Sequence, residues 1–200
     1  MRLLATPELG SQLQQWGYSS EGAWLTAVDQ GSLSVGLHDP RAGTIPHLAP
    51  VGDPEPLVHF LAELLPALDP GQLLAMPGRS GQDHHPEDAD WQQSPEPSWA
   101  GQRPRLALPE TLREWGITEQ FVGAVLIEED DQPQALLALA EYAFVGRCDV
   151  RLCCERAPLV CCLCHEGDLH FQSPDLALLQ RIRTDALEAG LWPNPPDDWP

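Results

Sequence analysis

The stretch of sequence that decides the fold is CDVRLCCERAPLVCCLCHEGDLHFQSPDLALLQRIRTDALEAG, residues 148–190. Residues 148–155 alternate between two sides, which is the period-two pattern of a half-buried strand. Residues 159–165 form a second β-rich run, and residues 169–172 return as a third strand. All six cysteines of the chain lie in the first two of these strands, so any chemistry is sought there first.

Turn and capping residues separate these elements. Gly167-Asp168 suits a two-residue hairpin turn in which glycine comes first. Ser173 can cap a helix that has Pro174 at its first helical position, and apolar residues then recur at helical spacing until Gly190 ends the helix. The stretch therefore predicts a β-β-β-α unit.

The first part of the chain contains a comparable set of elements. Residues 7–17 have the pattern of a short helix, strands are expected at 23–28 and 33–37, and a helix begins near Asp53 and ends at Pro66. Two capped helices thus close two similar runs of strands. This similarity suggests an internal duplication of an α-β-β-α unit, with chance resemblance of capped helices as the alternative.

The second part opens with a matching segment. Pro109-Glu110 to Trp115-Gly116, followed by an apolar strand at 122–127, resembles residues 7–17 and the strand that follows them. A further helix is expected at 133–144. The predicted fold class is α+β, with antiparallel sheets packed against helices.

Proline and glycine mark a boundary between the two parts. The segment 69–105 is rich in both and mostly polar between them, so it has little to bury in a core. One short strand is predicted inside it at Leu73 to Met76. The predicted organisation is an N-terminal α/β half at 1–68, a flexible linker at 69–105, and a C-terminal α+β half at 106–200.

Charge excludes some partners. The chain has 30 acidic and 11 basic residues and a formal net charge of −19. A surface of this kind repels nucleic-acid phosphates and anionic lipid, so neither nucleic-acid nor membrane binding is expected. It attracts a basic protein instead, although the same charge also serves solubility.

Composition and the first residues indicate a cytoplasmic bacterial protein. Every Lys or Arg position is arginine, which is typical of a GC-rich coding sequence. Residues 1–7 contain no apolar core long enough for a signal peptide, and no run approaches the roughly 18 apolar residues of a membrane helix. In a reducing cytoplasm the cysteines are expected as thiols.

The cysteine cluster has two interpretations, a zinc site and a set of core thiols. Cys161-x-x-Cys164 has ligand spacing, and His165, His170, Cys153 and Cys154 are close in sequence. In a straight strand, however, Cys161 and Cys164 point to opposite faces, and free cysteine packs well as a small core residue. We therefore expect no metal and no cofactor.

Strand register defines the best alternative site. Two-residue turns at Arg156-Ala157 and Gly167-Asp168 would place Leu152 opposite Cys161 and His165 opposite both Cys148 and His170. The resulting metal or catalytic set is Cys148, Cys161, His165 and His170. The same face also carries Val150 and Leu163, so the primary expectation is a core.

If this face of the sheet is part of the core, the thiols of Cys148, Cys154 and Cys161 are reduced and buried against the helix at 174–187. Cys153, Cys162 and Cys164 lie on the opposite face and react sooner unless another layer covers them.

Signatures of catalysis are missing. No cysteine immediately precedes a predicted helix, and the sequence has no phosphate-binding glycine loop, no GxSxG and no HExxH motif. The expectation is a protein that is not an enzyme and has no catalytic residues. The alternative is a metal-binding or thiol-dependent enzyme that uses the 148–170 cluster.

The second part also resembles a known family. Leu108-Pro109-Glu110-Thr111-Leu112 as an opening helix, and residues 160–171 as strand, turn and strand before a closing helix, are similar to the SUKH superfamily of Smi1/Knr4-like domains over roughly residues 106–190. The resemblance implies a non-enzymatic bacterial immunity-type domain that binds another protein, such as a toxin, through an acidic face.

Overall fold

The computed structural model of the chain describes residues 1–16, 25–29, 32–35, 43–49, 55–77, 99, 108–118, 121, 123–144, 149–164 and 167–193. Within these residues the fold is α+β, as predicted, because the helices pack on a sheet whose strand pairs are antiparallel.

The strands are β1 (Arg2–Ala5), β2 (Leu25–Asp29), β3 (Ser32–Val35), β4 (Gly43–Ala49), β5 (Leu73–Pro77), β6 (Gly123–Ile127), β7 (Val150–Cys154), β8 (Val160–Leu163), β9 (Leu169–Ser173) and β10 (Trp192–Pro193). The helices are α1 (Thr6–Gln15), α2 (Glu55–Ala67), α3 (Glu110–Glu114), α4 (Gln132–Phe144) and α5 (Leu176–Glu188), with a 3-10 turn, η2 (Glu129–Asp131), before α4. The helix expected at 133–144 is therefore present.

One sheet combines strands from all parts of the chain. Within the described residues it has eight strands in the order β1-β6-β5-β7-β8-β9-β4-β10, and β2 and β3 form a separate pair. The ranges 1–68, 69–105 and 106–200 each contribute strands to this sheet. The predicted division therefore does not correspond to separate sheets, because β1 pairs with β6 and β4 pairs with β9 across the whole chain.

Strand β5 confirms the short strand predicted at Leu73 to Met76, so this part of the range 69–105 belongs to the sheet. It lies between β6 and β7, and all five of its residues are buried. An apolar run with both faces covered is typical of a central strand. The remaining part of that range lies outside the described residues, apart from Trp99, whose side chain is completely buried.

The first cysteine-rich hairpin has the predicted register. Leu152 faces Cys161, and Val150 faces Leu163. Side chains directly opposite each other in an antiparallel pair share a face, so Leu152 and Cys161 project to the same side of the sheet.

The second hairpin has a different register from the one predicted. Cys162, not His165, faces His170, and Leu163 faces Leu169. The Cys164 amide donates to the Asp168 carbonyl at 2.9 Å, which closes the hairpin with three residues between them. Gly167 has φ +87°, and a glycine at positive φ ends a common three-residue hairpin loop. The shift of three positions places His170 on the face opposite to Cys161.

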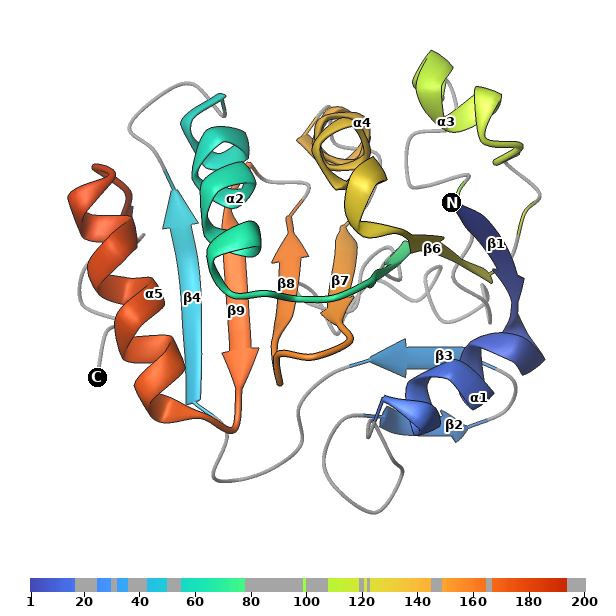
Figure 1. The fold of residues 1–200 in the computed structure, drawn as a ribbon, viewed down its shortest axis with the longest axis horizontal. Coiled ribbons are helices and arrows are strands. Elements are labelled where there is room, and N and C mark those ends of the chain that lie inside the picture. The colour runs from blue at the N-terminus through green and yellow to red at the C-terminus, as the bar shows by residue number, and fades with distance from the viewer. Residues whose placement is uncertain are drawn as a thin grey trace, which may run out of the picture.

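The first face of the sheet carries the larger core. Its residues include Val125, Leu152, Cys161 and Phe171, which pack against buried residues of α2, α4 and α5. Figure 1 shows these three helices on one side of the sheet. Helix α4 packs against β7 and β8, whereas α5 packs against β4 and β9. The buried Cys154 and Cys161 are thus on strands covered mainly by α4 rather than by the predicted helix at 174–187.

The opposite face carries a smaller core under α1. Cys153 packs there with Leu4, Leu9, Leu13 and other buried residues of β1, β5, β6 and β8. This second layer explains why Cys153 is buried, although its face was expected to be more open. Towards β8 and β9 the same face is more polar, and Cys162 and His170 are only partly buried there.

The order of elements repeats along the chain. It is β-α-β-β-β-α-β from β1 to β5 and again, after α3 and with η2 counted as part of α4, from β6 to β10. This order aligns α1 with α4, whereas the sequence pattern aligned residues 7–17 with 109–116. Internal duplication remains a prediction. Among the described residues, no helix is both long and apolar enough to cross a membrane.

Candidate functional site

The predicted set of Cys148, Cys161, His165 and His170 is not brought together as a unit. Cys148 and His165 lie outside the described residues. Cys161 pairs with Phe171, while His170 pairs with Cys162, so Cys161 and His170 project from opposite faces. A metal ion cannot bind both side chains through the sheet.

Three of the cysteines are core thiols. Burial raises the pKa of the Cys154 thiol to about 12 and raises those of Cys153 and Cys161 well above the usual value. Neighbouring thiols add to the shift, with Cys154 raising Cys153 and Cys162 raising Cys161. A thiol that keeps its proton is neither a nucleophile nor a metal ligand.

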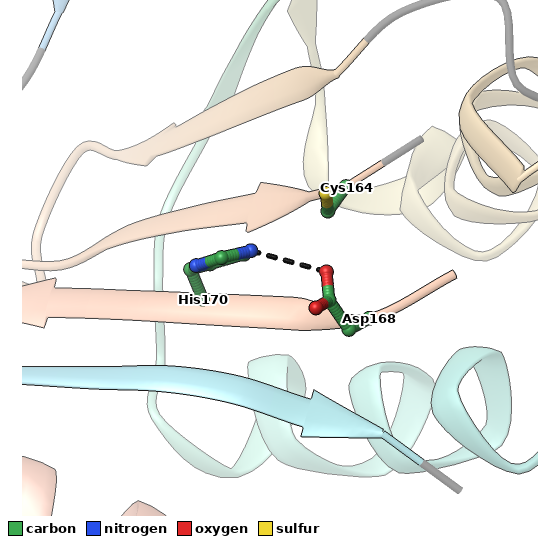
Figure 2. Close-up of side chains that lie close together, drawn as sticks. All are labelled: Cys164, Asp168 and His170. Carbon is green, nitrogen blue, oxygen red and sulfur yellow. Dashed lines mark hydrogen bonds and ion pairs between the residues drawn. The ribbon is translucent and has the colours of Figure 1, made fainter. Parts of the chain in front are cut away.

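A different group of side chains meets at the β8–β9 hairpin. Cys164, Asp168 and His170 each offer one ligand atom, and these atoms all lie within 4.8 Å of one another. His170 Nε2 is 3.0 Å from Asp168 Oδ1 (Figure 2). Cys164 and Asp168 are buried, and His170 is partly exposed. This trio contains one residue of the predicted set and two that the predicted register missed.

The trio does not have the geometry of a nucleophilic triad. In such a triad the imidazole lies between the nucleophile and the carboxylate, with one ring nitrogen for each. Figure 2 shows Asp168 and Cys164 both beyond the same edge of the His170 ring, with Nε2 directed to Asp168. The arrangement suits binding of a cation better than activation of a thiol.

A solvent-open groove lies between α2 and α4. The two helices contact each other and leave a volume of about 590 Å³ open to solvent. Its lining is mostly apolar and consists of Glu55, Val58, His59, Ala62, Pro133, Leu136, Leu137, Ala140, Glu141 and Phe144. This volume lies within the range of ligand-binding pockets, roughly 300–1,000 Å³.

Leu137 marks the α4 side of this groove. It is 61% exposed, the highest value among the exposed large hydrophobic residues that the structure describes. The sequence contained a signal for it, because residues 135–140 read ALLALA and are apolar around the whole helix. One sheet-facing stripe needs fewer apolar residues than this, so the excess indicates a second apolar surface.

A smaller hollow of about 200 Å³ continues the groove towards the end of α2. It shares Ala62, Pro133 and Leu136 with the main groove and adds the carboxylates of Asp69 and Glu129. Both carboxylates bind the guanidinium of Arg156, at 2.6 Å and 3.0 Å. The hydrogen bond to Asp69 is the main reason that the pKa of Arg156 lies above its usual value.

Comparisons with known proteins identify no relative. No family model matches the chain, and no curated protein or solved structure matches it significantly. The SUKH-type interpretation of residues 106–190 therefore remains a prediction that rests on the residues quoted for it.

Proposed function

We propose that the chain is a non-enzymatic binding module that holds a basic, amphipathic segment of another protein in the groove between α2 and α4. The single observation that carries this proposal is the apolar groove of about 590 Å³ with the exposed Leu137 at its edge. Apolar surface that remains open on a folded domain is typical of interaction sites.

The apolar lining determines what fits. Val58, Ala62, Leu137 and Phe144 come from two neighbouring helices and offer aliphatic and aromatic contacts. An amphipathic helix can place apolar side chains at i, i+3, i+4 and i+7 into a groove of this kind. The apolar contacts would supply most of the binding free energy.

The charge of the groove determines the sign of the charge that a partner should carry. Glu55 and Glu141 lie in the main groove, whereas Asp69 and Glu129 in the adjoining hollow already pair with Arg156. Among the residues that line the main groove only His59 can carry positive charge, and it already contacts Glu63 at 3.3 Å. Together with the net charge of −19, the carboxylates of Glu55 and Glu141 favour Arg or Lys beside the apolar anchors of the partner.

Arg156 shows how such a basic residue can be held. Its guanidinium lies between Asp69 and Glu129, at the ends of two different elements. In the main groove an arginine of a partner would find Glu55 and Glu141 beside the apolar lining. The SUKH resemblance favours a toxin as the partner, in which case binding would block a basic surface of the toxin.

A labelled peptide tests the groove directly. The probe is a helical 14-residue peptide of Leu, Ala and Arg with leucines on one face, followed by fluorescence anisotropy. Leu137→Glu should weaken binding more than about tenfold, because it places charge in the apolar contact. Leu176→Glu is the matched control, since Leu176 is 60% exposed on α5, compared with 61% for Leu137.

The contribution of charge to binding is tested with a second pair of variants. Glu141→Gln should weaken binding and reduce its dependence on salt, whereas Glu188→Gln on the exposed side of α5 should change neither. Equal losses for Leu137→Glu and Leu176→Glu, with both proteins folded by circular dichroism, would show non-specific adsorption and contradict the proposal.

A further inference from the structure

The register of the second hairpin places three ligand-bearing side chains on one face. Cys164 and Asp168 lie opposite each other where the hairpin closes, and the Cys164 amide donates to the Asp168 carbonyl at 2.9 Å. His170 follows two residues later on β9, so its side chain projects to the same side as that of Asp168. A short hairpin with a fixed register therefore presents one thiol, one carboxylate and one imidazole together.

The distances are close to those of a tetrahedral metal site. Zinc lies about 2.0–2.1 Å from nitrogen or oxygen and about 2.3 Å from sulfur, which puts neighbouring ligand atoms roughly 3.3–3.6 Å apart. His170 Nε2 and Asp168 Oδ1 are 3.0 Å apart, and all three ligand atoms lie within 4.8 Å of one another. Small rotations of the side chains bring the three atoms around a common centre.

Burial and charge also suit a divalent cation. The side chain of Asp168 is only 8% exposed and that of His170 is 23% exposed, so the imidazole side is the open route to solvent. A thiolate and a carboxylate together carry two negative charges, and with a neutral imidazole they neutralise one divalent ion. A neutral cluster costs less to bury than a separate carboxylate and thiolate.

The donor types identify the metal. Calcium and magnesium are bound by oxygen ligands, whereas mixed sulfur, nitrogen and oxygen sets are typical of zinc. We propose that Cys164, Asp168 and His170 form a zinc-binding site at the closed end of the β8–β9 hairpin. The fourth ligand is a water molecule, as in other zinc sites with three protein ligands.

The site is independent of the proposed binding groove. It lies at the closed end of the β8–β9 hairpin, whereas the lining of the groove comes from α2 and α4. Zinc bound to both strands would hold the hairpin closed, because its three protein ligands come from both sides of the turn. Binding of the metal only to the folded chain raises the stability of the fold.

Cobalt(II) chloride is the direct probe, because cobalt replaces zinc and its absorption reports a thiolate ligand. The protein is purified without chelator, and its metal is then removed before titration with cobalt. It should bind one cobalt ion per chain, with sulfur-to-cobalt charge transfer and the visible bands of a tetrahedral site. Zinc should displace the cobalt. Zinc should also raise the thermal unfolding midpoint of the unmodified chain.

Matched variants assign the ligands. Cys164→Ser should abolish the charge-transfer band, and Asp168→Asn and His170→Gln should each weaken cobalt affinity more than about tenfold, a loss at least as large as that for removing an outer-shell partner. Cys162→Ser and His59→Gln are the controls, since Cys162 lies beside His170 and His59 is an exposed histidine of α2. Both controls should keep the spectrum and the affinity of the unmodified chain.

Three results would overturn the assignment. The first is that the unmodified protein shows no sulfur-to-cobalt charge transfer. The second is that the charge-transfer band is lost in Cys162→Ser but kept in Cys164→Ser. The third is that the affinity for cobalt is unchanged in both Asp168→Asn and His170→Gln. Asp168→Asn preserves the shape of the side chain, so it decides the question if Cys164→Ser does not fold. Normal metal binding by Leu137→Glu would separate this site from the groove.

Discussion

A methyl group at Gly123 provides a severe test of the pairing between β1 and β6. An added Cβ would lie 2.1 Å from the backbone oxygen of Leu4 and 3.0 Å from the ring of Phe121. The backbone of Gly123 has φ +146°, a conformation that residues with side chains rarely adopt. Gly123→Ala therefore forces a change in the backbone and not merely in a flexible side chain.

The cost can be worked out from these contacts. Backbone strain contributes on the order of 1–3 kcal/mol. The clash with Leu4 can be relieved only by moving β1 away from β6, and each of the hydrogen bonds lost contributes about 0.5–1.5 kcal/mol. The indole of Trp99 also donates to the Gly123 carbonyl at 3.2 Å, so this bond is disturbed as well. The expected loss in the free energy of unfolding is about 3 kcal/mol or more.

Urea unfolding followed by tryptophan fluorescence measures this loss. Gly10→Ala is the control, because a Cβ at Gly10 meets nothing within 4 Å and the residue lies inside α1. Alanine in place of glycine within a helix should stabilise by about 0.5–1 kcal/mol. The two substitutions should therefore have opposite signs. A loss below about 1 kcal/mol for Gly123→Ala would refute the close approach of β1 and β6.

Thiol reactivity, alkaline stability and a buried hydroxyl provide further tests. Iodoacetamide should label the partly exposed Cys162 before the fully buried Cys161, and mass spectrometry of peptides from the folded protein would show the reverse order if the burial were wrong. Burial raises the pKa of the Cys154 thiol from 9.0 to about 12. The contribution of this thiol to stability is therefore complete below pH 9 and is lost as the pH rises towards 12, by up to about 1.4 kcal/mol per pH unit. Cys154→Ala should make the urea midpoint fall less steeply over this range. Tyr142→Phe removes a hydroxyl that donates to the Trp99 carbonyl at 2.9 Å, and it should cost about 1–2 kcal/mol in thermal unfolding, whereas no change would contradict this bond.

The two cysteine-rich hairpins show how far the sequence can determine register. The first register follows from the alternation of residues 148–155 and a short polar connection, and Leu152 faces Cys161 as predicted. In the second hairpin Gly167 fits either the first position of a two-residue turn or the last position of a three-residue loop. The structure has the second arrangement, with φ +87° at Gly167. The two possible roles of Gly167 thus lead to different registers, and the register decides which candidate ligand side chains share a face of the sheet.

The groove depends on contacts that the local sequence does not contain. Helices α2 and α4 were both predicted, but their positions side by side depend on β5 lying between β6 and β7. The apolar run at Leu73 to Met76 predicted a strand, yet the many prolines and glycines after it favoured a linker. Hydrophobic periodicity in the sequence predicts whether a segment is a helix or a strand and which of its faces is buried. The neighbours of a central strand, however, are set by pairing between residues far apart in the sequence.

The strand order has a consequence for synthesis on the ribosome. Strand β1 pairs with β6, β5 pairs with β6 and β7, and β4 pairs with β9, so the partners of these early strands are all translated late. A nascent chain that ends before β6 exposes unpaired strand edges, and such edges promote association with other chains. The sheet is therefore complete only after β10 has left the ribosome, and until then its unpaired strand edges can associate with other chains.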